Sequence, residues 1–293
     1  MEVGLAMTEK GGRAEIVTAD AFQVYKGMDI GTAKPTPEDR RGIAHHLIDL
    51  VEPTDSFTVH DWLRHAERTI ADIRARGSLP IVVGGTHLYI KAFLDGMFEG
   101  PPVDAALRER LRAQPLAELR AELERADPAA AQRIHPADAR RTARALEVFH
   151  QTGTPISDLQ QQWDRENHSR EDCVLIGLDW PAELINPRIN ARVKEMLDRG
   201  LVEEARGLHS SGRLGPQARE ALGYKQLIAH FEGRCSLDEA IEKIKVETRR
   251  FGKNQRTWLK RLRPTPGSVW IDAALTTPET RPGAVLGACA PQK

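Results

Sequence analysis

An aspartate stands directly after a short apolar run, where a parallel α/β sheet would present reactive groups. The run is AEIVTA, residues 14–19, and Asp20 follows it at the start of DAFQVYKGMDIGTAKP. Because such folds carry their reacting groups at the carboxyl edge of the sheet, Asp20 is a candidate general base or metal ligand. A helix N-cap or turn aspartate is the alternative, which the spacing alone favours. Gly27, Gly31, Lys34 and Pro35 further along predict a tight loop in which a cation, the lysine ammonium, is held near a backbone turn.

A second polar group follows another apolar run, LPIVV at residues 79–83. The next residues are Gly84, Gly85 and Thr86. Two glycines at a strand end let the backbone approach a ligand closely, and a threonine there either caps the next helix or donates to an anion. His87 comes next, and without a partner in the sequence it is interpreted as a surface or packing residue.

Basic residues gather at three further places. Residues 245–263 carry eight basic side chains against one acid, with Phe251 and Trp258 interleaved, which is typical of a nucleic-acid surface. A solvated face with both aromatic residues in the core is the alternative. Two smaller candidates also occur. Arg140, Arg141 and Arg144 form a cluster that could clamp a phosphate backbone, and Arg219 could bind an anion.

The elements that must position these groups follow from periodicity. Strand 14–19, a helix over 59–76 and strand 79–83 predict an α/β domain with a parallel sheet. The strand-free region 103–162 predicts a helical insert. The remaining expected elements are a strand at 173–179, helices at 187–199, 202–210, 218–231 and 237–262, a short strand at 269–271 and a loose tail over 274–293.

Composition narrows the class of protein. Lys plus Arg and Asp plus Glu both number 42, so a nucleic-acid surface must come from local clustering of charge. Three cysteines far apart in the sequence predict reduced thiols and no metal site. No run is long and apolar enough for a membrane span, and the first residues lack the pattern of a signal peptide, so we expect a soluble cytoplasmic protein.

Taken in order, several blocks of the chain resemble the tRNA dimethylallyltransferases (tRNA isopentenyltransferases). The resemblance covers about residues 14–272, and its motifs are DAFQVYKGMDIGTAKP, HHLID, VVGGTHLY, RIHPADARRTARALEVF, ALGYKQ and ETRRFGKNQRTWLKR. It implies an α/β fold with a P-loop NTPase-like parallel sheet core, formed by residues 1–102 and 163–273 together with the C-terminal helices. It also implies that the insert at 103–162 grips tRNA.

The same resemblance implies a reaction and a set of roles. The family transfers the dimethylallyl group of dimethylallyl diphosphate to N6 of the adenosine 3′ of the anticodon, with Mg2+ as cofactor. Asp20 matches the general base, and Thr86 matches a residue of the channel near the site of transfer. Residues expected to bind the tRNA anticodon stem-loop are Ala21, Phe22, Gln23, Arg140, Arg141, Arg144, Lys253, Asn254, Gln255, Arg256 and Lys260. Arg219 and Lys34 are expected to bind the diphosphate, and the protein is expected to be a monomer.

The chain also departs from the family pattern. Ala21 stands where a serine is usual, and Gly252 where an alanine is usual. The family's phosphate-binding loop, G-x-x-x-x-G-K-S/T, does not occur in the 293 residues, which predicts unpaired neighbouring strands and little activity of the chain as written. Two explanations stay open: a wrongly assigned gene start in an active enzyme, or a catalytically inactive tRNA-binding paralogue.

Overall fold

The computed structural model describes residues 6, 12–160, 170, 172–277 and 279–288, and it divides into two compact units. The larger unit consists of Met1–Ala92 and Arg170–Lys293, and the smaller of Phe93–Ser169. The insert predicted at 103–162 therefore falls within the smaller unit, its last two residues lying outside the described part of the chain. None of the described helices is long and apolar enough to cross a membrane.

The larger unit combines strands and helices in an α/β arrangement. Its strands are β1 (Ala14–Thr18), β2 (His45–His46), β3 (Leu79–Val83), β4 (Ile176–Asp179) and β5 (Val269–Asp272). Its helices are α2 (Pro37–Arg40), α3 (Val59–Ala75), α4 (His87–Asp95, which runs into the smaller unit), α10 (Ala182–Asp198), α11 (Leu201–Ser210), the 3-10 helix η2 (Ala218–Glu220), α12 (Tyr224–Phe231), α13 (Leu237–Leu262) and α14 (Arg281–Ala288).

Two parallel sheets are formed by the described strands. The first has the order β2-β1-β3, and β4 pairs with β5 in the second. Strand β1 lies in the centre of the first sheet with Val17 fully buried, and the indole of Trp62 on α3 donates to the carbonyl of Thr18 at 2.8 Å. At the ends of β3, Leu79 is 44% exposed and Val83 is 46% exposed. Such exposure is unusual for an apolar strand of a parallel sheet.

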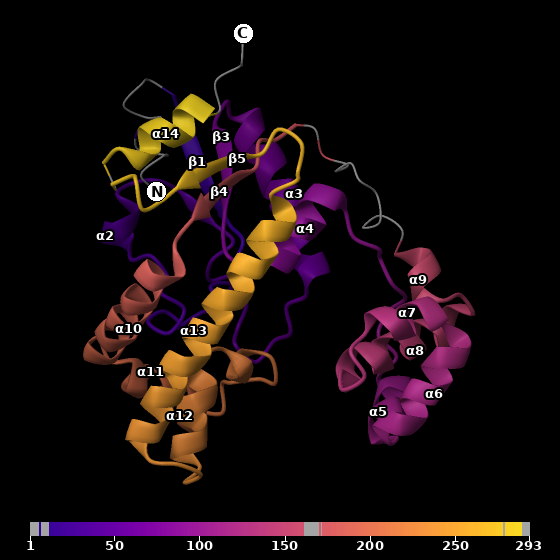
Figure 1. The fold of residues 1–293 in the computed structure, drawn as a ribbon. Helices are drawn as coiled ribbons and strands as arrows, with labels where there is room; N and C mark the ends of the chain where they lie inside the picture. Colours follow the sequence, from indigo (N-terminus) through magenta and orange to yellow (C-terminus); the bar gives the residue numbers. More distant parts are fainter. Residues whose placement is uncertain (1–5, 7–11, 161–169, 171, 278, 289–293) are drawn as a thin grey trace. The chain divides into compact units, whose positions relative to one another are not determined.

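Helices α10 to α13 pack beside one another in the larger unit (Figure 1). The crossing of α13 with α10 is close, because a Cβ on Gly252 would lie 3.2 Å from Ile189 Cδ1. This contact explains the glycine where an alanine is usual: the smaller residue accepts the neighbouring helix at a modest cost in helix propensity.

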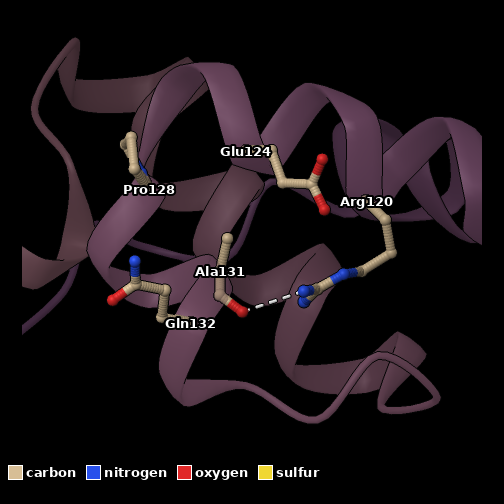
Figure 2. Close-up of a pocket in the computed structure, with 5 residues that line it drawn as sticks. All are labelled: Arg120, Glu124, Pro128, Ala131 and Gln132. Atoms are coloured by element: carbon tan, nitrogen blue, oxygen red, sulfur yellow. Dashed lines mark hydrogen bonds between the residues drawn. The ribbon is translucent and has the colours of Figure 1, made fainter.

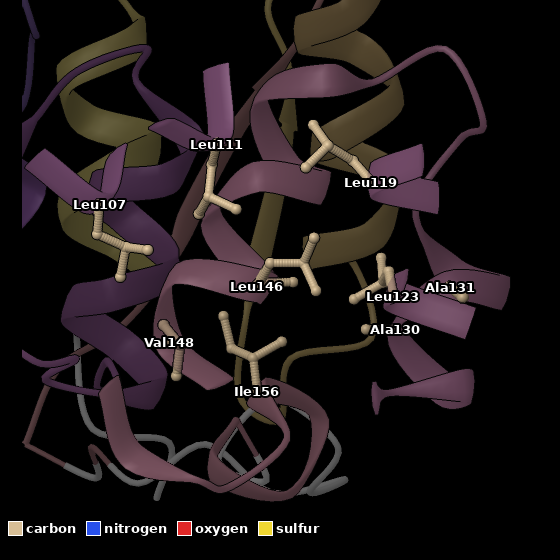
Figure 3. Packing of buried hydrophobic residues seen from close by; sticks show 10 residues of the cluster. Leu107, Leu111, Leu119, Leu123, Ala130, Ala131, Leu146, Val148 and Ile156 are labelled. Carbon is tan, nitrogen blue, oxygen red and sulfur yellow. The ribbon is translucent and has the colours of Figure 1, made fainter. Parts of the chain in front are cut away.

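The smaller unit is entirely helical where it is described. Its helices are α5 (Ala105–Ala113), α6 (Leu116–Ala126), α7 (Pro128–Arg133), α8 (Ala139–Thr152) and α9 (Ile156–Leu159). Apolar side chains from all five helices, mostly leucine and alanine but with Val148 and Ile156, meet in one core (Figure 3). Asp127 is also buried there: its Oδ1 accepts from the Ala130 amide and the Ser157 hydroxyl, and its Oδ2 from the Ser157 amide, which ties α7 to α9.

In three places the described helices differ from the predicted ones. The helix expected at 218–231 is interrupted, because Gly223 adopts φ 92° between η2 and α12. Helix α10 begins before Pro187 and contains it, since packing against α13 holds the helix together across the missing amide. The tail expected to be loose contains α14, where Arg281 donates to the carbonyls of Ala273 and Thr276.

Replacing Asp127 by alanine is expected to destabilise the smaller unit. The change leaves two amides and a hydroxyl without an acceptor in a buried place, which should lower the opening free energy of α7 and α9 by about 3 kcal/mol. Amide hydrogen exchange measures this free energy locally. Glu109→Ala, on the exposed surface of α5, is the matched control. Equal exchange in the two variants would refute a stabilising role for Asp127.

Candidate active site

Asp20 lies just beyond β1, with its carboxylate oriented by the backbone that follows. Its Oδ1 accepts from the amides of Phe22 at 2.9 Å and Gln23 at 3.2 Å. The prediction of a turn aspartate is thus confirmed. Oδ2 takes no part in these two bonds, and the residue is partly exposed, so the turn orients the carboxylate through one oxygen alone.

Thr86 lies beside Asp20 because the ends of β1 and β3 are joined. The amide of Ala21 donates to Thr86 Oγ1 at 3.1 Å, and the amide of Thr86 donates to the Ala19 carbonyl at 3.3 Å. The strands approach so closely that a Cβ on Gly84 would lie 2.0 Å from that carbonyl oxygen, so a glycine is required there. Thr86 Oγ1 acts as an acceptor towards Ala21, which leaves its proton for donation to a ligand.

The long helix α13 is fastened to the same strand end. Gln255 Nε2 donates to the Gly85 carbonyl at 3.1 Å, and the rings of His87 and Trp258 stack with centroids 6.0 Å apart. Burial lowers the pKa of His87, which favours the neutral imidazole in this stack. Sequence reasoning missed both contacts: it assigned Gln255 to tRNA and found no partner for His87.

Lys34 is the cation of a tight loop, as predicted, but its ammonium is engaged within the protein. Its ammonium donates to the Tyr25 carbonyl at 2.8 Å and to the carboxylates of Asp29 and Asp49, each at 2.6 Å. The side chain is 4% exposed. With three acceptors for its three protons, Lys34 holds its own loop in shape and has no proton left to donate to a diphosphate.

Gln23 is also engaged in this loop. Its Nε2 donates to the carbonyls of Thr32 at 3.1 Å and Ala33 at 3.4 Å. The side-chain amide nitrogen therefore stabilises the loop, so a contact between this side chain and tRNA would have to use its oxygen. Its neighbours Ala21 and Phe22 are partly exposed beside Asp20.

Three of the basic residues of α13 form a stripe on one side of the helix. Lys253, Arg256 and Lys260 recur at three- and four-residue spacing and so share a face, and both lysines are exposed. Asn254 is exposed as well. Phe251 is 47% exposed, which excludes the alternative that both aromatic residues belong to the core.

In the smaller unit, the predicted arginines differ in their surroundings. Arg140 and Arg141 are exposed on α8, and Arg141 pairs with Asp138 at 3.4 Å. Arg144 pairs instead with the buried carboxylate of Glu147 at 3.3 Å, which Arg108 also contacts at 2.9 Å. Arg144 is therefore fixed by an internal ion pair, whereas the other two reach solvent.

A shallow pocket in the smaller unit does not contain the predicted residues. It is lined by Arg120, Glu124, Pro128, Ala131 and Gln132. Figure 2 shows Arg120 spanning its edge, where the guanidinium donates to the Ala131 carbonyl at 2.8 Å. A second bond from Arg120 reaches the carbonyl of Ile134 at 3.2 Å, so this arginine orders the segment that leads into α8.

The described contacts do not bring the predicted diphosphate ligand Arg219 together with Asp20. Arg219 on η2 is exposed and pairs with Glu232 at 3.1 Å, and none of the contacts among the described residues joins it to Asp20. The described part of the chain also contains no group of three carboxylate, imidazole or thiol side chains suited to a metal. Mg2+ commonly needs only one or two carboxylates plus substrate phosphates, and Asp20 is the carboxylate at this strand edge.

Comparisons with known proteins identify the family of the chain. Residues 23–262 match the family model described as IPP transferase. The tRNA dimethylallyltransferase of Geobacillus thermodenitrificans is 46% identical over 283 residues, covering 95% of this chain and 87% of its own. That of Geobacter sulfurreducens is 42% identical, with 92% and 87% covered.

Solved structures give the same relationship. A tRNA isopentenylpyrophosphate transferase from Staphylococcus epidermidis has a TM-score of 0.68 at 31% identity, with 98% of this chain and 94% of that chain covered. A eukaryotic dimethylallyltransferase acting on tRNA has a TM-score of 0.78 at 27% identity, with 93% and 70% covered. The chain belongs to the IPP transferase family of prenyltransferases, whose members include the tRNA dimethylallyltransferases.

Proposed function

We propose that the chain transfers the dimethylallyl group of dimethylallyl diphosphate to N6 of the adenosine 3′ of the anticodon in tRNA. The observation that supports it most is the junction of β1 and β3, where the amide of Ala21 donates to the Thr86 hydroxyl and the carboxylate of the preceding Asp20 accepts from the Phe22 amide. The relatives named tRNA dimethylallyltransferase support this choice of donor and acceptor.

The proposed step uses Asp20 as a general base. An exocyclic adenine amine is a weak nucleophile, because its lone pair is delocalised into the ring. As the bond between N6 and the allylic carbon forms, the carbon–oxygen bond to diphosphate breaks and diphosphate leaves. The amine proton passes to Oδ2 of Asp20, while Oδ1 stays bonded to the two amides that orient the carboxylate. The adenine must first leave its stack in the RNA to reach this site.

The remaining predicted residues are proposed to hold the two substrates. The stripe formed by Lys253, Arg256 and Lys260 on α13, together with Asn254, supplies cations and donors for a tRNA backbone. Arg140 and Arg141 would do the same from the smaller unit, with Arg144 as a more constrained member of that cluster. Ala21 and Phe22 lie next to Asp20, where they would contact the flipped nucleotide.

Diphosphate and Mg2+ belong to the same proposal. Arg219 is the cationic candidate for the leaving diphosphate, and a magnesium ion would neutralise charge on its oxygens when bound. Thr86 would donate to the same group from the strand end. We further propose that the protein acts as a monomer in the cytoplasm, where its tRNA substrate is found.

Asp20→Asn is expected to slow transfer about 100-fold or more, because the amide cannot accept the amine proton. The measurement is single-turnover transfer of labelled dimethylallyl to an anticodon stem-loop, with the dissociation constant of the stem-loop expected to stay unchanged. Asp72→Asn, an exposed residue of α3, is the matched control. Transfer at the normal rate by Asp20→Asn would refute its role as base. Stem-loop binding without transfer by the unaltered chain would instead favour the tRNA-binding paralogue.

Replacing Lys253 and Lys260 together by alanine is expected to weaken stem-loop binding and its dependence on salt. The slope of log affinity against log salt should fall by about one for each lost phosphate contact. Lys194→Ala provides a control, since this exposed lysine of α10 pairs with Asp198 on its own helix. An unchanged slope in the double variant would exclude this stripe from the RNA interface.

A further inference from the structure

The carboxylate of Glu204 on α11 is surrounded by donors from two distant parts of the chain. Oε2 accepts from the amides of Asp29 at 3.0 Å and Ile30 at 2.9 Å, and Oε1 accepts from the amide of Gly31 at 3.1 Å. The hydroxyl of Tyr224 on α12 donates to the same Oε1. Successive backbone amides that converge in this way form an anion-binding concavity, and here a side chain of the protein supplies the anion.

The fit of this carboxylate depends on the residues around it. A Cβ on Gly31 would lie 2.4 Å from Tyr224 Cε2, so only glycine allows the tyrosine to reach Glu204. Burial, together with the charge of Glu204, raises the pKa of Tyr224, which keeps the hydroxyl protonated and able to donate. Tyr224 itself is fully buried. Glu204 therefore binds a rigid set of donors.

Hydrogen bonds and short stretches of backbone together connect this carboxylate to Asp20. The loop held by Glu204 continues into Thr32 and Ala33, whose carbonyls accept from Gln23 Nε2. The amide of Gln23 in turn donates to Asp20 Oδ1 at 3.2 Å. Moving the loop would thus move Gln23, and with it one of the two amides that orient Asp20.

We propose that Glu204, assisted by Tyr224, is a positioning residue for the transfer reaction. It holds the loop Asp29–Gly31 and, through Gln23, fixes the orientation of the Asp20 carboxylate. This inference rests on the proposed transferase function, because it assigns Glu204 to the geometry of the proposed base. Glu204 touches neither reacting atom and acts only through the loop.

The test compares Glu204→Gln with unaltered protein. Glutamine keeps the size of the side chain but loses its charge and one of its two acceptor oxygens, so the loop should loosen. The kcat of transfer to an anticodon stem-loop is expected to fall about 10- to 100-fold, as for other small misplacements of catalytic groups. The stem-loop dissociation constant should stay unchanged, and the amides of Phe22 and Gln23 should exchange hydrogen faster.

Two further variants sharpen the comparison. Glu203→Gln changes the neighbouring, exposed glutamate of α11 and is expected to leave kcat and exchange as they are. Tyr224→Phe removes one of the four donors to Glu204 and should give a smaller loss of kcat than Glu204→Gln. Should Glu204→Gln fail to fold, Tyr224→Phe is measured in its place, and unchanged kcat and exchange in that variant would overturn the inference.

The outcomes separate this inference from the proposed function. Transfer by Glu204→Gln at the normal kcat overturns the positioning role while leaving the transferase intact. A fall in kcat that is matched by an equal loss of stem-loop binding indicates a general structural role and also overturns it. If unaltered protein transfers nothing, the proposed function fails, and exchange at Phe22 and Gln23 decides: faster exchange in Glu204→Gln supports positioning, and equal exchange refutes it.

Discussion

Backbone hydrogen bonds join the carboxyl ends of β1 and β3, and the positions of Asp20 and Thr86 depend on them. Ala19 donates to the Val83 carbonyl at 2.7 Å and accepts from Thr86, and Thr86 Oγ1 then accepts from Ala21. A parallel pair of strands brings such ends to one edge, but only a glycine at position 84 allows the approach seen here. Asp20 and Thr86 come together as a consequence.

Buried or half-buried charges keep the surrounding loop in one conformation. Lys34 binds two carboxylates from inside the loop, and Glu204 binds three of its amides from outside. Leu47 and Asp49 adopt positive φ, at 63° and 55°, which costs free energy for residues other than glycine. Because desolvated charges are costly without partners, these groups favour a single well-ordered arrangement over a mobile one.

Local patterns of sequence predicted much of this arrangement. Apolar runs ending in polar residues located β1 and β3, and helical periodicity located α3 and α13 with accurate limits. The sequence also marked Asp20 and Thr86 as candidate site residues. The structure links them through Ala21, whose amide donates to Thr86 Oγ1 across 65 positions. Helix limits that depend on a single residue were harder to predict. Gly223 interrupts a helix that the apolar periodicity continues, and Pro187 lies inside α10 although it was expected to be the first residue of that helix.

What the sequence could not reveal comes from partners far apart in the chain. Gln255 reaches Gly85 across 170 positions, and Glu204 reaches Ile30 across 174. No local spacing marks such pairs, and a half-buried glutamate on an amphipathic helix has the same pattern as an ordinary surface residue. The sequence likewise gives no sign that all three protons of Lys34 are donated to acceptors within the protein, one of which is Asp49, 15 positions away.

The most direct test of the account is to identify the product formed on tRNA. Purified protein is incubated with tRNA, dimethylallyl diphosphate and Mg2+, and the digested RNA is analysed by mass spectrometry. We expect one added five-carbon unit, located on N6 of the adenosine 3′ of the anticodon. RNA that gains no mass, or gains it at another nucleotide, would contradict the central claim that the Asp20 and Thr86 site prenylates tRNA at this position.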